Sequence, residues 1–147
     1  MDMKRLVTGT VVGGITLFVL GYLIFDLAFA NFYATNAGPA AGVNRDAQLV
    51  WAVALGTFAY AALITLVIES RGGSATIGAG VQMGAVVGFL LWFTTDFILY
   101  GVTNIANLTR TVVDPLLELV RGGISGGVTA AVLERISASA RREVRRA

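Results

Sequence analysis

The chain has 147 residues, of which 56% are hydrophobic and 14% are charged, and its mean hydropathy is +0.76. These values exclude an ordinary soluble domain, because soluble domains carry about 25% charged residues. The absence of cysteine and histidine also excludes disulfides, thiolate chemistry, imidazole ligation of metals or haem, and histidine base catalysis.

The sequence predicts an all-α fold, a four-helix transmembrane bundle. A membrane helix needs about 20 apolar residues, so four of them use most of the chain. We expect Asp46 to cap the second span, and Asp114 followed by Pro115 to start the fourth. The spans are expected at about residues 6–34, 47–68, 75–100 and 114–134, and a basic cytoplasmic tail at 135–147.

The distribution of basic residues predicts the orientation of the bundle. Only Arg45, Arg110 and Arg121 lie in or beyond the half away from the termini. Positive residues favour the cytoplasmic side, so both termini are predicted to be cytoplasmic. The basic tail either binds anionic lipid or is a solvated topology signal. Because topology explains the basic residues, the sequence does not indicate nucleic-acid binding. The residues on the cytoplasmic side are Lys4, Arg5, Arg71, Arg135, Arg141, Arg142, Arg145 and Arg146.

An internal repeat is suggested by a shift of the chain that pairs Asp26 with Asp96 and needs no gap. If the repeat is real, two helical hairpins form parallel repeats about an axis along the membrane normal. Asp26 and Asp96 would then face each other across that axis. The other identical pairs are Gly14 with Gly84, Leu20 with Leu90, Leu49 with Leu119, Val50 with Val120, Gly56 with Gly126, and Leu63 with Leu133.

Small and aromatic residues separate along the predicted spans. Glycines recur every fourth residue, which predicts close helix packing, either within the chain or with a second copy. All fourteen aromatic residues lie toward the predicted outer side. That pattern predicts either a cavity open to the outside or a bulky surface facing lipid. The glycine series are Gly9 and Gly13; Gly80, Gly84 and Gly88; Gly122 and Gly126; and Gly123 and Gly127.

A polar cluster is predicted near the outer boundary of the hydrocarbon. Asp114, Glu118 and Arg121 are spaced four and then three residues apart, so they share one helical face, which should point inward rather than into lipid. Asp26 and Asp96 are expected at the same depth. One arginine does not neutralise these carboxylates, which leaves two readings open. The first is a site for a proton, a cation or a cationic ligand. The second is a set of ion pairs and amide hydrogen bonds that pin the loops, with the help of Asn31, Asn36, Asn104 and Asn107.

Several segments resemble a group of small bacterial four-span membrane proteins that carries no assigned activity. These segments are residues 32–38 (FYATNAG), 42–45 (GVNR), 96–104 (DFILYGVTN) and 108–114 (LTRTVVD). The resemblance implies a multi-pass protein of the bacterial cytoplasmic membrane and implies no mechanism.

Two functions follow as hypotheses. The first is a non-enzymatic accessory or structural subunit without a cofactor or metal, which packs with itself as a homo-oligomer or with a larger membrane complex. Close-packing glycines and the missing histidine and cysteine favour it. The alternative is a small carrier or ligand-binding protein that uses the acidic cluster. A carrier site is expected near the midplane of the membrane, which counts against this alternative.

Overall fold

A computed structural model describes residues 2–71 and 76–144 of the chain, and for residues 140–144 it describes the backbone alone. Within that part the chain forms an all-α four-helix bundle, as predicted, in which four helices are long and apolar enough to cross a membrane. The molecule is therefore a multi-pass membrane protein. The elements in chain order are α1 (Met3–Gly21), the π-helix η1 (Tyr22–Ala28), α2 (Ala30–Thr35), α3 (Val50–Glu69), α4 (Ile77–Val102) and α5 (Leu108–Val144).

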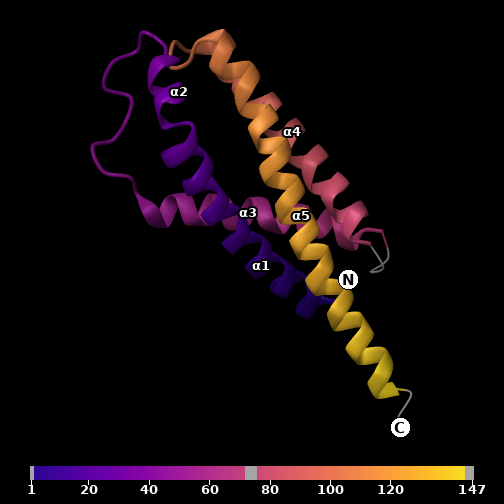
Figure 1. The fold of residues 1–147 in the computed structure, drawn as a ribbon. Coiled ribbons are helices and arrows are strands. Elements are labelled where there is room, and N and C mark those ends of the chain that lie inside the picture. Colours follow the sequence, from indigo (N-terminus) through magenta and orange to yellow (C-terminus); the bar gives the residue numbers. More distant parts are fainter. Residues whose placement is uncertain (1, 72–75, 145–147) are drawn as a thin grey trace.

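The bundle has two distinct ends (Figure 1). The loop end carries residues 36–49 and 103–107, and the terminal end carries the start of α1 and the end of α3. Helices α4 and α5 lie along each other, whereas α3 is drawn across them and packs mainly on α1. The helices therefore meet closely toward the terminal end and separate toward the loop end.

The first predicted span is not one continuous α-helix. In η1 the backbone hydrogen bonds reach five residues back, and the N–H of Phe29 still donates to the carbonyl of Ile24 at 2.8 Å. A π-helix changes the direction in which later side chains point. Buried residues follow α1 in steps of four, at Arg5, Gly9, Gly13 and Leu17, and this series ends where η1 begins.

The fourth span starts earlier than predicted, because Asn107 rather than Asp114 caps it. The Asn107 Oδ1 accepts the N–H of Arg110 at 2.9 Å, which satisfies a donor of the first turn. Asp114 and Pro115 therefore lie inside α5. The prediction for Asp46 was also wrong, since α3 begins at Val50 without a side-chain cap.

The predicted polar tail continues α5 as far as Val144. Alanine, arginine and glutamate favour helix, which explains why this segment extends the span. The expected contact of the basic tail with anionic lipid concerns side chains outside the described part of the chain.

Glycine allows α4 and α5 to touch through their backbones. A Cβ on Gly84 would lie 2.9 Å from the carbonyl carbon of Gly122 and 3.0 Å from the Cα of Gly126. Gly80 faces Gly126 in the same way one turn away. The predicted close packing is thus found within this chain.

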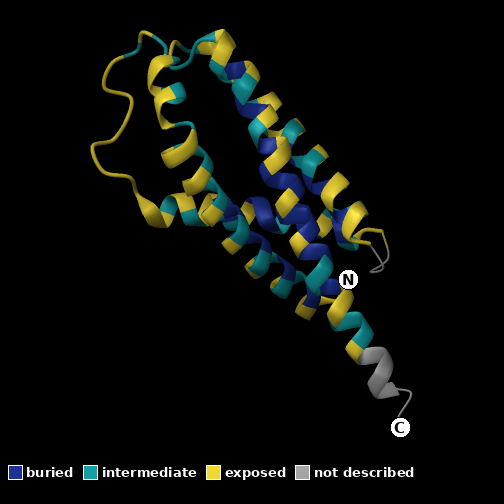
Figure 2. Ribbon diagram, viewed as in Figure 1, coloured by how far each residue is buried: buried dark blue, intermediate teal, exposed yellow. Residues whose placement is uncertain are grey.

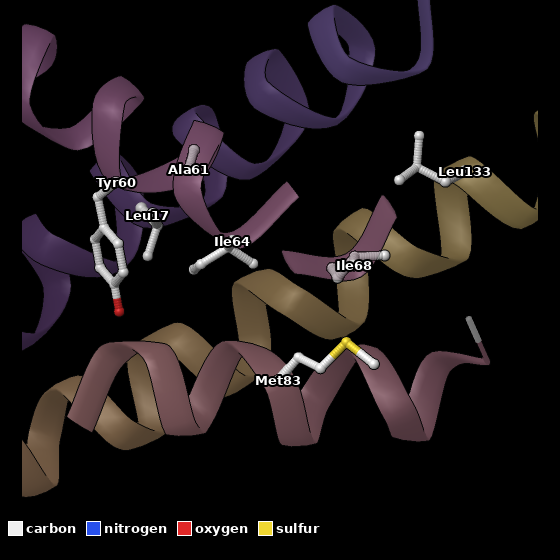
Figure 3. Close-up of a cluster of buried hydrophobic side chains, with 7 residues drawn as sticks. All are labelled: Leu17, Tyr60, Ala61, Ile64, Ile68, Met83 and Leu133. Carbon is white, nitrogen blue, oxygen red and sulfur yellow. The ribbon is translucent and has the colours of Figure 1, made fainter. Parts of the chain in front are cut away.

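The apolar core is small and joins all four long helices near the terminal end. Figure 2 shows the buried residues concentrated there and exposed residues along the separated half. Many large apolar side chains on the outside are exposed, as expected for helices that face lipid. The core residues, drawn in Figure 3, are Leu17, Tyr60, Ala61, Ile64, Ile68, Met83 and Leu133.

A buried ion pair joins three helices at the terminal end. The Nε of Arg5 donates to Glu69 Oε2 at 3.0 Å, and its Nη2 donates to Glu69 Oε1 at 2.7 Å. Its Nη1 donates to the carbonyl of Leu133 at 2.9 Å and also to the hydroxyl of Ser137. Arg5 thus connects α1 to α3 and α5. The sequence predicted for it only a role in setting the orientation of the bundle in the membrane.

The two loops at the loop end are joined by backbone and amide hydrogen bonds. The N–H of Gly38 donates to the carbonyl of Ile105, and that of Ala40 to the carbonyl of Asn104, both at 3.1 Å. The Nδ2 of Asn107 donates to Asn36 Oδ1 at 3.1 Å. These bonds tie the segment after α2 to the turn between α4 and α5.

Candidate functional site

A cavity of about 930 Å³ opens where the helices separate, between η1, α3 and α5. Leu91 and Trp92 of α4 also line it. Its walls are mainly apolar and aromatic. The aromatic side chains that line it are Phe18, Tyr22, Phe25, Tyr33, Tyr60 and Trp92. The polar or charged ones are Asp26, Gln48, Thr57, Arg110, Asp114, Glu118 and Arg121.

The centre of the polar wall is the pair formed by Glu118 and Arg121. The Arg121 Nη1 donates to Glu118 Oε1 at 2.6 Å, and only 8% and 1% of the two side chains are exposed. Arg121 also donates from Nε and Nη2 to the carbonyl of Leu17 at 3.0 and 2.9 Å. The guanidinium therefore holds α5 to α1, as well as neutralising the carboxylate.

Two further features of α1 and η1 accommodate the Arg121 side chain. A Cβ on Gly21 would lie 3.0 Å from Arg121 Nη2, so glycine leaves the guanidinium its room. The guanidinium carbon lies 5.5 Å from the centre of the Phe25 ring, within the range of a cation–π interaction. The wall of the cavity thus already holds one cation against an aromatic face.

Three buried polar atoms that belong to lining residues have no hydrogen-bond partner among the described residues: Glu118 Oε2, Tyr60 Oη and Trp92 Nε1. Figure 3 shows the Tyr60 hydroxyl directed from α3 toward α4 and α5. Buried polar groups are nearly always paired, so three orphans around one cavity need an explanation. Together they offer one carboxylate acceptor, one indole donor and one hydroxyl that can do either.

A second polar contact closes the cavity toward the loops. The Tyr33 hydroxyl donates to Asp114 Oδ1, and the Arg110 guanidinium carbon lies 4.9 Å from the centre of the Tyr33 ring. Burial and the bond to the Asp114 carboxylate raise the pKa of Tyr33 well above its usual range. Tyr33 therefore stays neutral and remains a donor.

We expect Tyr33→Phe to lower the free energy of unfolding by about 1 to 3 kcal/mol, because Asp114 is only 8% exposed and would lose this donor. Thermal unfolding in detergent micelles measures the change. Tyr100→Phe is the matched control, since Tyr100 is exposed at the end of α4. Equal melting temperatures for the two variants would show that the Tyr33 bond contributes nothing.

The structure gathers part of the predicted polar cluster. Asp114, Glu118 and Arg121 share the inner face of α5, and Asp96 on α4 interacts with Asp114 and Glu118. Asp26 lies on η1 at the exposed edge of the cavity, where it accepts a hydrogen bond from Gln48 Nε2 at 3.2 Å.

The predicted asparagines do not join the charged groups. Asn31 is exposed, and its carbonyl accepts from the hydroxyl of Thr35. Asn104 is exposed as well, and Asn107 caps α5 and bonds Asn36. The contacts of Asn104 and Asn107 fit the loop-pinning hypothesis, whereas that of Asn31 stays within α2. A binding role of the carboxylates stays a prediction.

The sequence did not single out Tyr60, Trp92 or Gln48 as site residues. The only signal was the gathering of aromatic residues toward one side, which predicted either a cavity or a surface facing lipid. Both are present, since Trp92 lines the cavity while Trp51 is 68% exposed.

The fold and the site define a class: a multi-pass α-helical membrane protein with a partly polar cavity at its loop end. In comparisons with protein-family models, curated proteins and solved structures, the chain matches none of them. Among the described residues, no group of three or more acidic side chains is placed to hold a metal ion.

Proposed function

We propose that the protein is a non-enzymatic membrane protein that binds a small amphipathic ligand in the cavity at its loop end. The observation that carries the proposal is that three residues lining one cavity hold buried polar atoms without a hydrogen-bond partner among the described residues: Glu118 Oε2, Tyr60 Oη and Trp92 Nε1. A ligand with an N–H or O–H group would supply the donor that the Glu118 oxygen lacks.

The size and lining of the cavity support this proposal. Small-molecule sites typically measure about 300 to 1,000 Å³ and combine apolar walls with a few placed polar groups. The cavity, at about 930 Å³, has both properties. The proposal places the cavity on the outer side of a bacterial cytoplasmic membrane, because the basic residues favour cytoplasmic termini.

Gly56 provides a direct test, because it lines the cavity and a Cβ there meets nothing within 4 Å among the described residues. Leucine at this position would fill part of the cavity without a clash. We expect Gly56→Leu to reduce the small molecule that copurifies from mild detergent by about tenfold or more, since a blocked site loses much of its contact area. Mass spectrometry of the extracted ligand measures the loss.

Gly101→Leu is the matched control, since that position on α4 is also open and does not line the cavity. It should retain the ligand. If the wild-type chain carries no small molecule, or if both variants carry as much as wild type, the binding proposal fails.

An accessory-subunit role is the second candidate, and the loop-side half of α3 favours it. Val50, Trp51 and Leu55 are 59%, 68% and 66% exposed there. These side chains form an exposed apolar surface on which a partner helix can pack. The close glycine contacts within the chain lie elsewhere, between α4 and α5. A stoichiometric protein partner without a bound small molecule, in the same purification, would support this role over the first.

A further inference from the structure

The charges around the cavity indicate the chemical class of the ligand, an inference that rests on the binding function proposed above. We propose that the ligand is a lipophilic amine in its protonated form, whose ammonium group donates to Glu118 Oε2 and whose apolar body lies along the aromatic walls.

The balance of charge on the cavity wall favours a cation. Three carboxylates line it, from Asp26, Asp114 and Glu118, against two guanidinium groups, from Arg110 and Arg121. The lining residues therefore carry one formal negative charge in excess. An anionic ligand would add to that excess in a partly desolvated site, where like charges repel strongly.

The second carboxylate oxygen of Glu118, Oε2, favours a ligand that carries a hydrogen-bond donor. Glu118 is 1% exposed, its Oε1 accepts from Arg121, and its Oε2 lacks a partner among the residues the structure describes. A charged N–H donor would satisfy this oxygen with one of the stronger hydrogen bonds that proteins form. A quaternary ammonium has no N–H, and an alcohol has no charge, so both should bind less tightly than an amine.

The aromatic walls suit the remainder of such a ligand. Phe18, Tyr22 and Trp92 line the cavity, and aromatic ring faces attract cations. Phe25 already receives the Arg121 guanidinium at 5.5 Å, which shows that this wall tolerates positive charge. The unpartnered Tyr60 hydroxyl lies beside Glu118 and can accept a second N–H.

The test uses Trp92 as a reporter. The chain has two tryptophans, so Trp51→Phe leaves Trp92 as the only one, and Trp51 lies outside the cavity lining. The full-length variant is placed in nanodiscs of zwitterionic lipid, with empty nanodiscs as the baseline for partitioning. Dodecylamine, dodecyltrimethylammonium and dodecanol are titrated at neutral pH while Trp92 fluorescence is followed.

We expect dodecylamine to bind about tenfold tighter than dodecyltrimethylammonium, which corresponds to about 1.4 kcal/mol, and dodecanol to bind weakest. Glu118→Gln should abolish the preference for the amine. Glu69→Gln is the matched control, because it removes a carboxylate whose side chain is only 5% exposed, at the far end of the bundle, and should leave the preference intact. Tyr60→Phe serves where Glu118→Gln does not fold, and should reduce the preference in part.

The outcomes separate this inference from the binding function beneath it. Equal affinity for all three probes, or equal affinity for the two cations, overturns the amine assignment and leaves a binding cavity. A preference that survives Glu118→Gln, or that Glu69→Gln also removes, overturns it as well. If none of the probes changes Trp92 fluorescence beyond the baseline while Gly56→Leu also retains the copurified molecule, both proposals fall.

Discussion

Gly84→Ala should destabilise the bundle by about 3 kcal/mol, although it adds a single methyl group. The new Cβ would lie 2.9 Å from the carbonyl carbon of Gly122 and 3.0 Å from the Cα of Gly126, so its nearest neighbours are backbone atoms of α5. Backbone does not rotate away as a flexible side chain does. Helices α4 and α5 would have to separate along the contact that Gly80 and Gly88 continue.

Gly101→Ala is the matched control on the same helix, because a Cβ there meets nothing within 4 Å among the described residues. Alanine favours helix over glycine by roughly 0.5 to 1 kcal/mol, so this variant should be neutral or slightly more stable. The same substitution would thus have opposite signs at two positions of α4. Thermal unfolding in mild detergent measures both, and a Gly84→Ala variant as stable as wild type would show that α4 and α5 do not touch in this way.

The sequence predicted the four spans because each carries enough apolar residues to cross a bilayer, a property that does not depend on tertiary contacts. Boundaries were harder, since they depend on local capping. Asn107 captures the Arg110 N–H, and that bond, rather than the sequence pair Asp114 and Pro115, fixes the start of α5.

The candidate site was predictable where it depends on helical spacing alone. Asp114, Glu118 and Arg121 fall on one face of α5 because they are four and three residues apart, and the structure turns that face inward. Asp26 lines the same cavity but lies at its exposed edge, on η1, and periodicity does not reveal a π-helix. The repeat that would pair Asp26 with Asp96 stays a prediction.

The sequence could not predict, for a different reason, which buried polar atoms lack a hydrogen-bond partner among the described residues. Whether Tyr60 Oη or Trp92 Nε1 finds a partner depends on groups from other helices within hydrogen-bond distance, and no spacing rule reports that. Arg5 presents the same difficulty, because its partner Glu69 is contributed by another span. In the sequence it was one of several basic residues that set the topology.

Arg5→Met should lower the free energy of unfolding by about 3 to 5 kcal/mol, because it leaves a buried carboxylate without its cation. Only 5% of the Glu69 side chain is exposed, and Arg5 supplies it with bonds at 3.0 and 2.7 Å. The same substitution also removes the bond to the Leu133 carbonyl, which is one of the contacts between α1 and α5 at this end. Arg135→Met is the matched control, since Arg135 is exposed and its loss should change stability by about 0.5 kcal/mol or less.

The double variant Arg5→Met with Glu69→Met separates pairing from packing. If the cost of Arg5→Met comes from the stranded carboxylate, removing Glu69 as well should restore part of the stability, because an apolar pair of similar volume often replaces a buried ion pair without loss. Unfolding of the wild type, the two single variants and the double variant gives the coupling free energy of the pair. A double variant as unstable as the sum of the two single ones would mean that Arg5 and Glu69 act independently and that the close approach of the helices does not depend on their contact.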